Sequence, residues 1–175
     1  DDDVVAIRAL RSVYGIGPVR AANLIEKGIR SLADLRVAVE TKAVRLEATQ
    51  QIGLRHVEEL ARKIPRLEML EHDAFLSEMR AAHHPSWELI ICGSYRRGKS
   101  ESGDIDVLIT CADDACMYKA DTGRVLQEFL QTLRTASYIT DDLASGPTKY
   151  MGVCRLGASR LHRRIDIRCF LPEQY

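Results

Sequence analysis

Two aspartates, placed just before an apolar and β-branched run, constrain this chain more than any other feature. The run DIDVLITC follows a glycine and predicts a strand over residues 104–111, entered from a turn. Side chains alternate between the faces of a strand, so Asp104 and Asp106 are expected on the same face. Adjacent carboxylates repel each other unless a cation lies between them, and oxygen ligands of this kind suit Mg²⁺. The alternative is a turn whose carboxylates only face solvent.

A loop rich in glycine and arginine leads into these aspartates. It reads GSYRRG over residues 93–98. Gly93 and Ser94 can present backbone N–H groups to an anion, and Arg97 can pair with phosphate oxygens through its planar guanidinium. Together the loop and the aspartates indicate a site where a divalent cation meets a polyphosphate.

The whole stretch GSYRRGKSESGDIDVLIT, residues 93–110, resembles the nucleotidyltransferase signature of the X family of DNA polymerases, the beta and lambda group. The resemblance implies that Asp104 and Asp106 hold two catalytic Mg²⁺ ions, with Mn²⁺ possible. It also implies a nucleotide-binding set of Gly93, Ser94, Arg97, Gly103 and Lys63. For Lys63, which lies in IGLRHVEELARKIPRLEM (52–69), a solvated surface lysine is the alternative.

A further strand carries a third carboxylate. The segment RRIDIRCF, residues 163–170, alternates charged with apolar residues and places Asp166 on one face with Arg164 and Arg168. These charges fit either a surface ion-pair row, worth about 0–1 kcal/mol, or part of a metal site. With the preceding TKYMGVCRL (148–156), the segment resembles the X-family pattern. That resemblance implies that Asp166 is the third metal ligand, catalytic with Asp104 and Asp106, and accepts or relays the proton of a hydroxyl.

The first half of the chain predicts two helices, over residues 4–13 and 19–25, joined by the turn Gly15-Ile16-Gly17-Pro18. Glycines let a backbone approach phosphates closely, and the N–H groups that open the second helix face an anion. A plain helix–helix turn is the alternative. The segment YGIGPVRAANLIEKGIRSLADLR, residues 14–36, resembles the X-family helix-hairpin-helix.

The hairpin resemblance implies binding of a duplex backbone without sequence readout. The implied DNA-binding residues are Gly15, Ile16, Gly17, Val19 and Arg20, with Lys149 and Arg164 from the second half. It further implies a monovalent cation, such as Na⁺ or K⁺, on the backbone carbonyls of Arg11, Val13 and Ile16.

The remaining periodicity predicts an α+β fold. Helices are expected over 31–39, 44–52, 54–63 and 66–82, the last with an apolar stripe of Leu67, Leu70, Ala74 and Met79. The expected domains are an all-helical fingers subdomain over 1–84, and a nucleotidyltransferase palm over 85–175 with a mixed β-sheet and covering helices. The family's lyase domain and thumb are expected to be absent.

Composition sets few limits on function. The chain of 175 residues has 25 basic and 25 acidic side chains, so its net charge gives no sign of a polyanionic partner. No apolar run approaches the length of a membrane span, and the five cysteines contain no C-x-x-C pair, which indicates buried thiols in a reducing compartment. We expect an intracellular monomer without a membrane partner, and the resemblance implies a nuclear location.

The implied function is template-directed addition of a deoxynucleotide, from its triphosphate, to a primer 3′-hydroxyl on gapped DNA. The implied context is DNA repair, by base excision or end joining. Two alternatives stay open: a polymerase core that binds DNA without turnover, and a nucleotidyltransferase acting on RNA or a small molecule. The second alternative would have no need of a DNA-binding hairpin.

Overall fold

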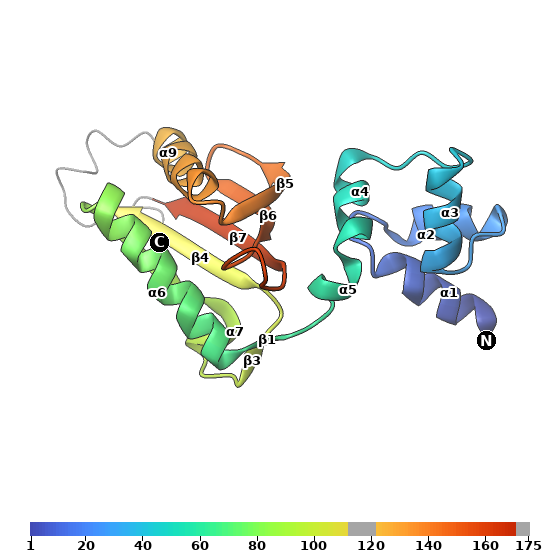
Figure 1. Ribbon diagram of the computed structural model, residues 1–175, viewed down its shortest axis with the longest axis horizontal. Coiled ribbons are helices and arrows are strands. Elements are labelled where there is room, and N and C mark those ends of the chain that lie inside the picture. The colour runs from blue at the N-terminus through green and yellow to red at the C-terminus, as the bar shows by residue number, and fades with distance from the viewer. Residues whose placement is uncertain (112–121, 171–175) are drawn as a thin grey trace. The chain divides into compact units, whose positions relative to one another are not determined.

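The computed structural model describes residues 1–111 and 122–170, except for the side chain of Cys111, and the chain divides into two compact units. The first unit, Asp1–Ala61, is helical, and the second, Arg62–Tyr175, combines a sheet with helices (Figure 1). The predicted α+β class is therefore confirmed. The sequence placed the boundary after residue 84, whereas the structure places it after Ala61, because the helix over 66–83 packs on the sheet and belongs to the second unit.

The first unit is built from short helices and is called the fingers below, and the second unit the palm, after the subdomains expected from the sequence. The Asp34 amide donates a hydrogen bond to the Ser31 hydroxyl at 3.0 Å, which caps the start of the third helix. Gly28, with a left-handed φ of +80°, follows the end of the second helix. Leu10, Leu24 and Leu35 are fully buried at the centre of its core. The helices are α1 (Asp2–Arg11), α2 (Pro18–Glu26), α3 (Leu32–Glu40), α4 (Ala48–Arg55) and α5 (Val57–Leu60).

The segment before α4 corrects the predicted helix over 44–52. Residues 43–47 have no helical backbone, although Val44 and Leu46 are buried in the fingers core and anchor the segment there. Helix α4 begins only at Ala48, where the Glu47 amide donates to the Gln50 side chain at 3.0 Å. The helix predicted over 54–63 is divided, because the helical backbone is interrupted at His56: Leu54 and Arg55 end α4, and Val57–Leu60 form α5.

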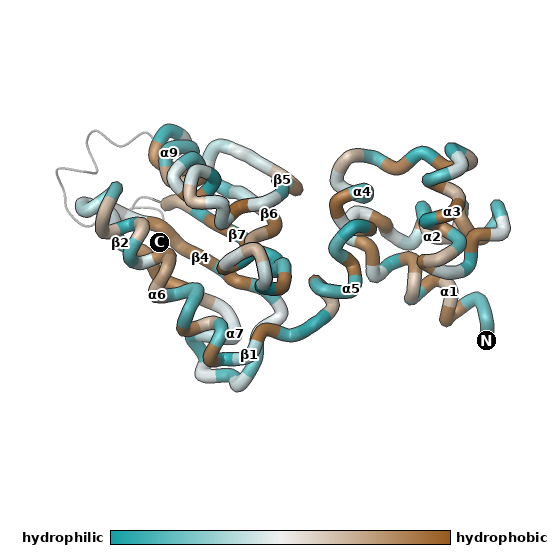
Figure 2. The backbone as a smooth tube through the Cα atoms, in the orientation of Figure 1, coloured by the Kyte–Doolittle hydropathy of each residue, from teal (hydrophilic) through white to brown (hydrophobic). Residues whose placement is uncertain are grey.

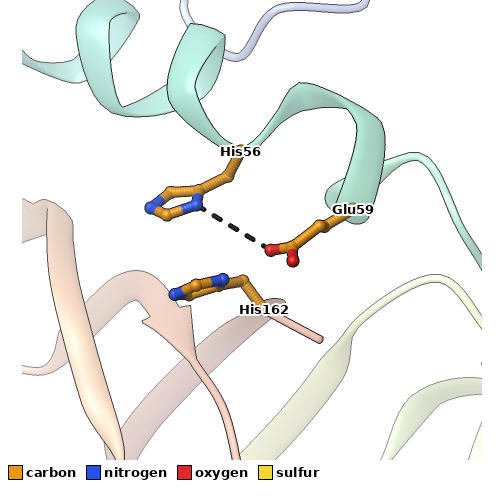
Figure 3. A group of neighbouring side chains, drawn as sticks. All are labelled: His56, Glu59 and His162. Carbon is orange, nitrogen blue, oxygen red and sulfur yellow. Dashed lines mark ion pairs between the residues drawn. The ribbon is translucent and has the colours of Figure 1, made fainter. Parts of the chain in front are cut away.

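A buried histidine lies at that break. His56 Nδ1 lies 4.0 Å from Glu59 Oε2, so the side chains of the N-cap and of the first turn of α5 face each other (Figure 3). His162, drawn in the same picture, belongs to the second unit.

The second unit, the palm, contains a five-stranded mixed sheet of order β2-β4-β7-β6-β5. Strands β4 and β7 are parallel, and the other neighbouring pairs are antiparallel. A separate two-stranded pairing joins β1 to β3. The elements are β1 (Ile64–Pro65), α6 (Arg66–His83), β2 (Trp87–Ile91), α7 (Gly93–Arg96), β3 (Glu101–Ser102), β4 (Ile105–Cys111), α9 (Thr122–Thr135), β5 (Ile139–Ser145), β6 (Lys149–Cys154) and β7 (Arg163–Phe170).

The two faces of the sheet differ in chemistry. Ile105, Val107 and Ile109 alternate into the core that α6 and α9 cover, and β4 appears as an apolar band in Figure 2. Asp106 lies between them in sequence and therefore on the opposite face, as does Asp166 on β7. Helices α6 and α9 thus pack on the face opposite the carboxylates. The carboxylate-bearing face, which no helix of residues 1–111 and 122–170 was found to cover, is called the uncovered face below.

Helix α6 corrects the predicted apolar stripe. Of the predicted stripe, Met79 packs against the core, but Ala74 is exposed and Leu67 and Leu70 are 76% and 47% exposed. Met69, His72 and Leu76 are buried against the sheet instead. His72 can occupy this buried face because its Nδ1 meets the Tyr138 hydroxyl at 2.8 Å and its Nε2 lies 3.4 Å from Glu68 Oε1.

The structure bears on two expectations from composition, the absence of a membrane span and the burial of the cysteines. Within residues 1–111 and 122–170, no helix is long and apolar enough to cross a membrane. The thiols of Cys154 and Cys169 are free and buried, and that of Cys92 is free and half-buried. Cys116 and the side chain of Cys111 lie outside the described residues.

Candidate active site

Parallel pairing of β4 with β7 brings two of the predicted carboxylates side by side. Asp106 and Asp166 are direct register partners, so their Cα atoms lie on neighbouring strands that are about 4.8 Å apart. Asp104 lies in the bend one residue before β4. Residues 60 positions apart in sequence are therefore joined by the strand register, which the alternation pattern alone did not fix.

The charges of this group act on one another. Partial desolvation raises the pKa of Asp104, and the carboxylates of Asp166 and Asp106 raise it further, while Arg164 and Lys63 lower it. Asp166 is drawn to Arg164, whose Nη2 donates to Asp166 Oδ1 at 2.8 Å. The Arg164 Nη1 also donates to the Gly152 carbonyl at 2.9 Å, which fixes the guanidinium on the sheet.

Three carboxylates with few cations form an oxygen-only donor set, which fits a hard divalent cation. Asp104, Asp106 and Asp166 would be the residues that hold such a cation.

The Gly93 backbone lies against the Asp106 side chain. A Cβ built on Gly93 would lie 3.6 Å from Asp106 Cβ and 3.7 Å from its Oδ2, and Gly93 has a left-handed φ of +66°. The Cys92 amide donates to the Asp106 carbonyl at 2.7 Å and holds the two segments together. The predicted loop forms one helical turn, α7, and the Arg97 Nη2 donates to Ser94 Oγ at 3.4 Å.

Lys63 reaches the same place through the β1–β3 pairing. Because Ile64 pairs with Ser102, the preceding Lys63 falls opposite Gly103. The Lys63 Nζ lies 3.5 Å from the position of a Cβ on Gly103, and its charge lowers the pKa of Asp104. The structure therefore brings Lys63, Gly103 and Asp104 together.

A buried ion pair, which the sequence analysis missed, supports the backbone of Lys63. Arg163 donates two bonds to Glu68, at 2.8 and 2.7 Å, and its Nη1 donates to the carbonyls of Arg62 at 3.0 Å and Lys63 at 3.4 Å. Burial opposes ionisation of Glu68, but the bonds and charge of Arg163 outweigh it and hold the pKa of Glu68 below its usual value. The available signal was the alternation over 163–170, which places Arg163 on the buried face and so requires a buried anion.

In the fingers, the glycine turn has the backbone that close approach requires. Gly15 has a φ of +88°, Ile16 is buried, and a Cβ on Gly17 would meet no atom within 4 Å. Pro18 opens α2, so the amides of the first helical turn point outward without a side-chain cap. The Val13 carbonyl accepts the Ile16 amide at 3.1 Å and has a second lone pair.

Helix α4 fixes the shape of this turn. The buried Gln50 side chain donates to the Gly15 carbonyl at 3.0 Å. A Cβ on Gly53 would lie 2.7 Å from the Tyr14 carbonyl oxygen, so the backbone of α4 touches the hairpin directly. The sequence analysis missed both residues: it placed Gly53 between two predicted helices, whereas Gly53 lies inside α4.

A surface hollow of about 580 Å³ lies beside the turn. It is lined by Gly17, Pro18, Val19, Arg20, Asn23, Arg45, Glu47 and Gln50. The Arg20 Nη2 donates to the Arg45 carbonyl at 2.9 Å, which ties the predicted DNA-binding arginine to the segment before α4. Arg45 is a second cation of this hollow that the sequence analysis did not identify.

The two remaining predicted DNA-binding residues lie in the palm. Lys149 is exposed on β6 opposite Arg168, and two positions along the same pairing Met151 lies opposite Asp166. Paired residues share a face, so Lys149 belongs to the uncovered face with Asp166. Arg164 is on this face too, but its guanidinium is engaged by Asp166 and Gly152.

Family models match both units of the chain. The model described as DNA polymerase beta palm matches residues 63–172, and that described as the fingers domain of DNA polymerase lambda matches residues 8–61. The chain belongs to the X family of DNA polymerases. The junction between the two X-family matches coincides with the boundary between the fingers and palm units.

Three named proteins align with this chain, two of them over nearly all of it. DNA polymerase lambda of Rattus norvegicus is 36% identical over 172 residues, covering 95% of this chain and 28% of the relative. DNA polymerase lambda of Arabidopsis thaliana is 30% identical over 185 residues, covering 100% of this chain and 33% of the relative. DNA nucleotidylexotransferase of Xenopus laevis is 26% identical over 107 residues, covering 61% of this chain and 20% of the relative. The chain thus spans about a third or less of the length of these relatives.

Proposed function

We propose that this chain is the fingers and palm of a template-directed DNA polymerase that extends a primer across short gaps. The observation that carries the proposal is the register of Asp106 with Asp166, beside the left-handed Gly93 and the Lys63 ammonium. A carboxylate pair next to a cationic, amide-rich turn matches the needs of a nucleoside triphosphate and its metal ions. Proteins named DNA polymerase lambda, similar over nearly the whole chain, support the same reading.

In this proposal Asp104, Asp106 and Asp166 hold two divalent cations, Mg²⁺ or Mn²⁺. The bound ions would lower the pKa of the primer 3′-hydroxyl and neutralise charge on the leaving pyrophosphate. Asp166 accepts or relays the hydroxyl proton. Arg164 lies near the primer terminus. The bond from the 3′-oxygen to the α-phosphorus forms as the bond between the α-phosphate and pyrophosphate breaks.

The cationic side of the site receives the triphosphate. Ser94 and Arg97 meet its β and γ phosphates, with the amides of α7 and the Lys63 ammonium neutralising further charge. Gly93 and Gly103 place the backbone close to Asp106 and to Lys63, and the left-handed φ of Gly93 favours glycine at that position.

The fingers hairpin holds the duplex backbone. The turn residues Gly15, Ile16 and Gly17, the Val19 amide in the first turn of α2, and the Arg20 guanidinium would contact one phosphate region. A monovalent cation, Na⁺ or K⁺, on the carbonyls of Arg11, Val13 and Ile16 would bridge the turn to a phosphate. Lys149 adds a contact from the palm. A nuclear monomer in base excision repair or end joining is the corresponding cellular role.

A single-turnover experiment tests this function. The full chain, in excess over a labelled primer on a one-nucleotide gapped duplex, is mixed with Mg²⁺ and the matching deoxynucleotide, beside the Asp166→Ala variant. Extension by the parent alone supports the proposal. Duplex binding by both proteins without extension would leave a DNA-binding core without turnover. Tighter binding of single-stranded RNA than of gapped DNA would favour another nucleotidyltransferase.

A further inference from the structure

Two side chains of helix α6, those of Arg66 and Asp73, bond the loop that carries Gly93, Ser94 and Arg97. Arg66, at the start of α6, donates from its amide to the Ser100 carbonyl at 2.9 Å. Its Nη1 donates to the carbonyls of Tyr95 at 3.0 Å and Lys99 at 3.2 Å. One arginine therefore holds the loop at both its beginning and its end.

The Tyr95 side chain contacts both of these residues of α6. The Arg66 guanidinium carbon lies 4.8 Å from the centre of the Tyr95 ring, and the Tyr95 hydroxyl donates to Asp73 Oδ2 at 2.8 Å. Positions 66 and 73 are two helical turns apart and so lie on one face of α6. The other oxygen of Asp73 accepts the Ser77 hydroxyl at 3.3 Å, which holds the carboxylate in place.

The loop that contains Tyr95 includes two glycines whose backbone is costly to order. Gly93 and Gly98 both have left-handed backbones, and glycine loses the most conformational freedom when it is fixed. Within the loop, amides of Gly98 and Lys99 donate to the carbonyls of Tyr95 and Ser94 at 3.0 and 3.1 Å. Tyr95 lies between Ser94 and Arg97, which face the nucleotide in the proposed function, and its own side chain points to α6 instead.

We propose that Tyr95, held by Asp73 and Arg66, is a positioning residue that pre-forms the loop of residues 93–97 for a nucleoside triphosphate. A pre-formed loop loses less conformational entropy when its ligand binds. Helix α6 therefore sets nucleotide affinity without touching the nucleotide. The inference rests on the proposed function, because it assumes that this loop binds the triphosphate.

The test measures nucleotide affinity without chemistry. The full chain is bound to a one-nucleotide gapped duplex whose primer ends in a dideoxynucleotide, and the matching deoxynucleoside triphosphate with Mg²⁺ is titrated by calorimetry. Tyr95→Phe removes only the hydroxyl and should weaken nucleotide binding about threefold to tenfold, the range for one hydrogen bond, with duplex affinity unchanged. Asp73→Asn, which keeps an acceptor oxygen, should lose less affinity than Asp73→Ala.

Tyr150→Phe is the matched control. The Tyr150 hydroxyl donates to Asp142 Oδ1 at 2.5 Å, so this variant also removes a tyrosine–aspartate bond from the palm, but on the helix-covered face of the sheet. It should lower the melting temperature and leave nucleotide affinity at the parent value. Equal affinity of Tyr95→Phe and the parent, or equal weakening by Tyr150→Phe, would overturn the positioning role while leaving the proposed function standing. A parent complex that binds the duplex but no nucleotide would overturn both.

Discussion

The fingers hairpin and the uncovered face of the palm carry side chains and backbone groups of opposite charge. The hairpin offers outward amides and the Arg20 guanidinium, whereas the palm offers Asp104, Asp106 and Asp166. A phosphate can bind the first surface directly, but it can approach the second only together with cations. If the proposed function holds, DNA binding and chemistry are therefore carried by different groups of this chain. Each prediction below tests that separation.

The largest effect is expected from removing one palm carboxylate. Asp166→Ala should slow single-turnover extension by at least about a thousandfold, the scale for losing a group that stabilises transition-state charge, while duplex affinity changes little. Quench-flow extension and fluorescence anisotropy measure the two quantities. Glu78→Gln, which removes an exposed charge of α6, should match the parent in both. Parallel loss of extension and duplex binding in Asp166→Ala would remove the separation.

Breaking the buried ion pair of the palm should destabilise that unit alone. Glu68→Gln leaves the Arg163 charge buried without its partner, which costs about 3–5 kcal/mol of the free energy of unfolding. Denaturant unfolding followed by hydrogen exchange separates the palm from the fingers, whose protection should stay at the parent value. Glu128→Gln breaks the exposed pair with Arg124 and should cost below about 1 kcal/mol. A loss of stability shared equally by both units would show that they unfold together.

As the pH falls, the free energy of unfolding of the palm should decrease before that of the fingers. Burial lowers the pKa of His72 to about 4, although Glu68 opposes this shift, whereas an unfolded histidine has a pKa of about 6.5. Between these values the unfolded chain binds a proton that the folded chain does not. The stability contribution is therefore complete above pH 6.5 and is lost as the pH falls toward 4, by up to about 3 kcal/mol.

His72→Met should flatten this loss, measured as the free energy of unfolding of the palm between pH 7 and pH 4. The control His83→Gln changes an exposed histidine at the end of the same helix and should keep the parent's slope. A parent whose palm stability does not change between pH 6.5 and 5 would contradict the role given to His72.

The smallest effect is expected at the hollow beside the hairpin. Arg45→Ala should reduce the dependence of log affinity on log salt concentration by about one, as expected for one lost phosphate contact, and lower duplex affinity severalfold. Binding isotherms over a salt series, with EDTA present, measure this. Arg30→Ala removes a guanidinium that pairs with Asp3 outside the hollow and should leave the slope unchanged. An unchanged slope for Arg45→Ala would remove Arg45 from the DNA surface.

Where sequence prediction failed, it failed for a shared physical reason. The stripe of Leu67 and Leu70 on α6 looked apolar, yet the buried side of that helix contains His72, whose Nδ1 meets the Tyr138 hydroxyl at 2.8 Å. A polar residue can occupy a core position when its partners arrive from distant elements, and hydrophobic periodicity does not record those partners. The helix predicted over 44–52 begins only at Ala48. Tertiary packing buries Val44 and Leu46 although their segment is not helical, and periodicity does not distinguish the two cases.

The sequence by itself determined which side chains can do chemistry. Alternation along two strands put Asp106 and Asp166 on the faces away from their apolar neighbours, and the glycine turn marked the start of α2, because these are local consequences of strand and helix geometry. Only the tertiary structure decided that Asp106 pairs with Asp166, that Lys63 lies at Gly103, and that α6 holds Tyr95. Strand register and side-chain contacts between distant elements depend on the packing of the whole unit, which no local pattern specifies.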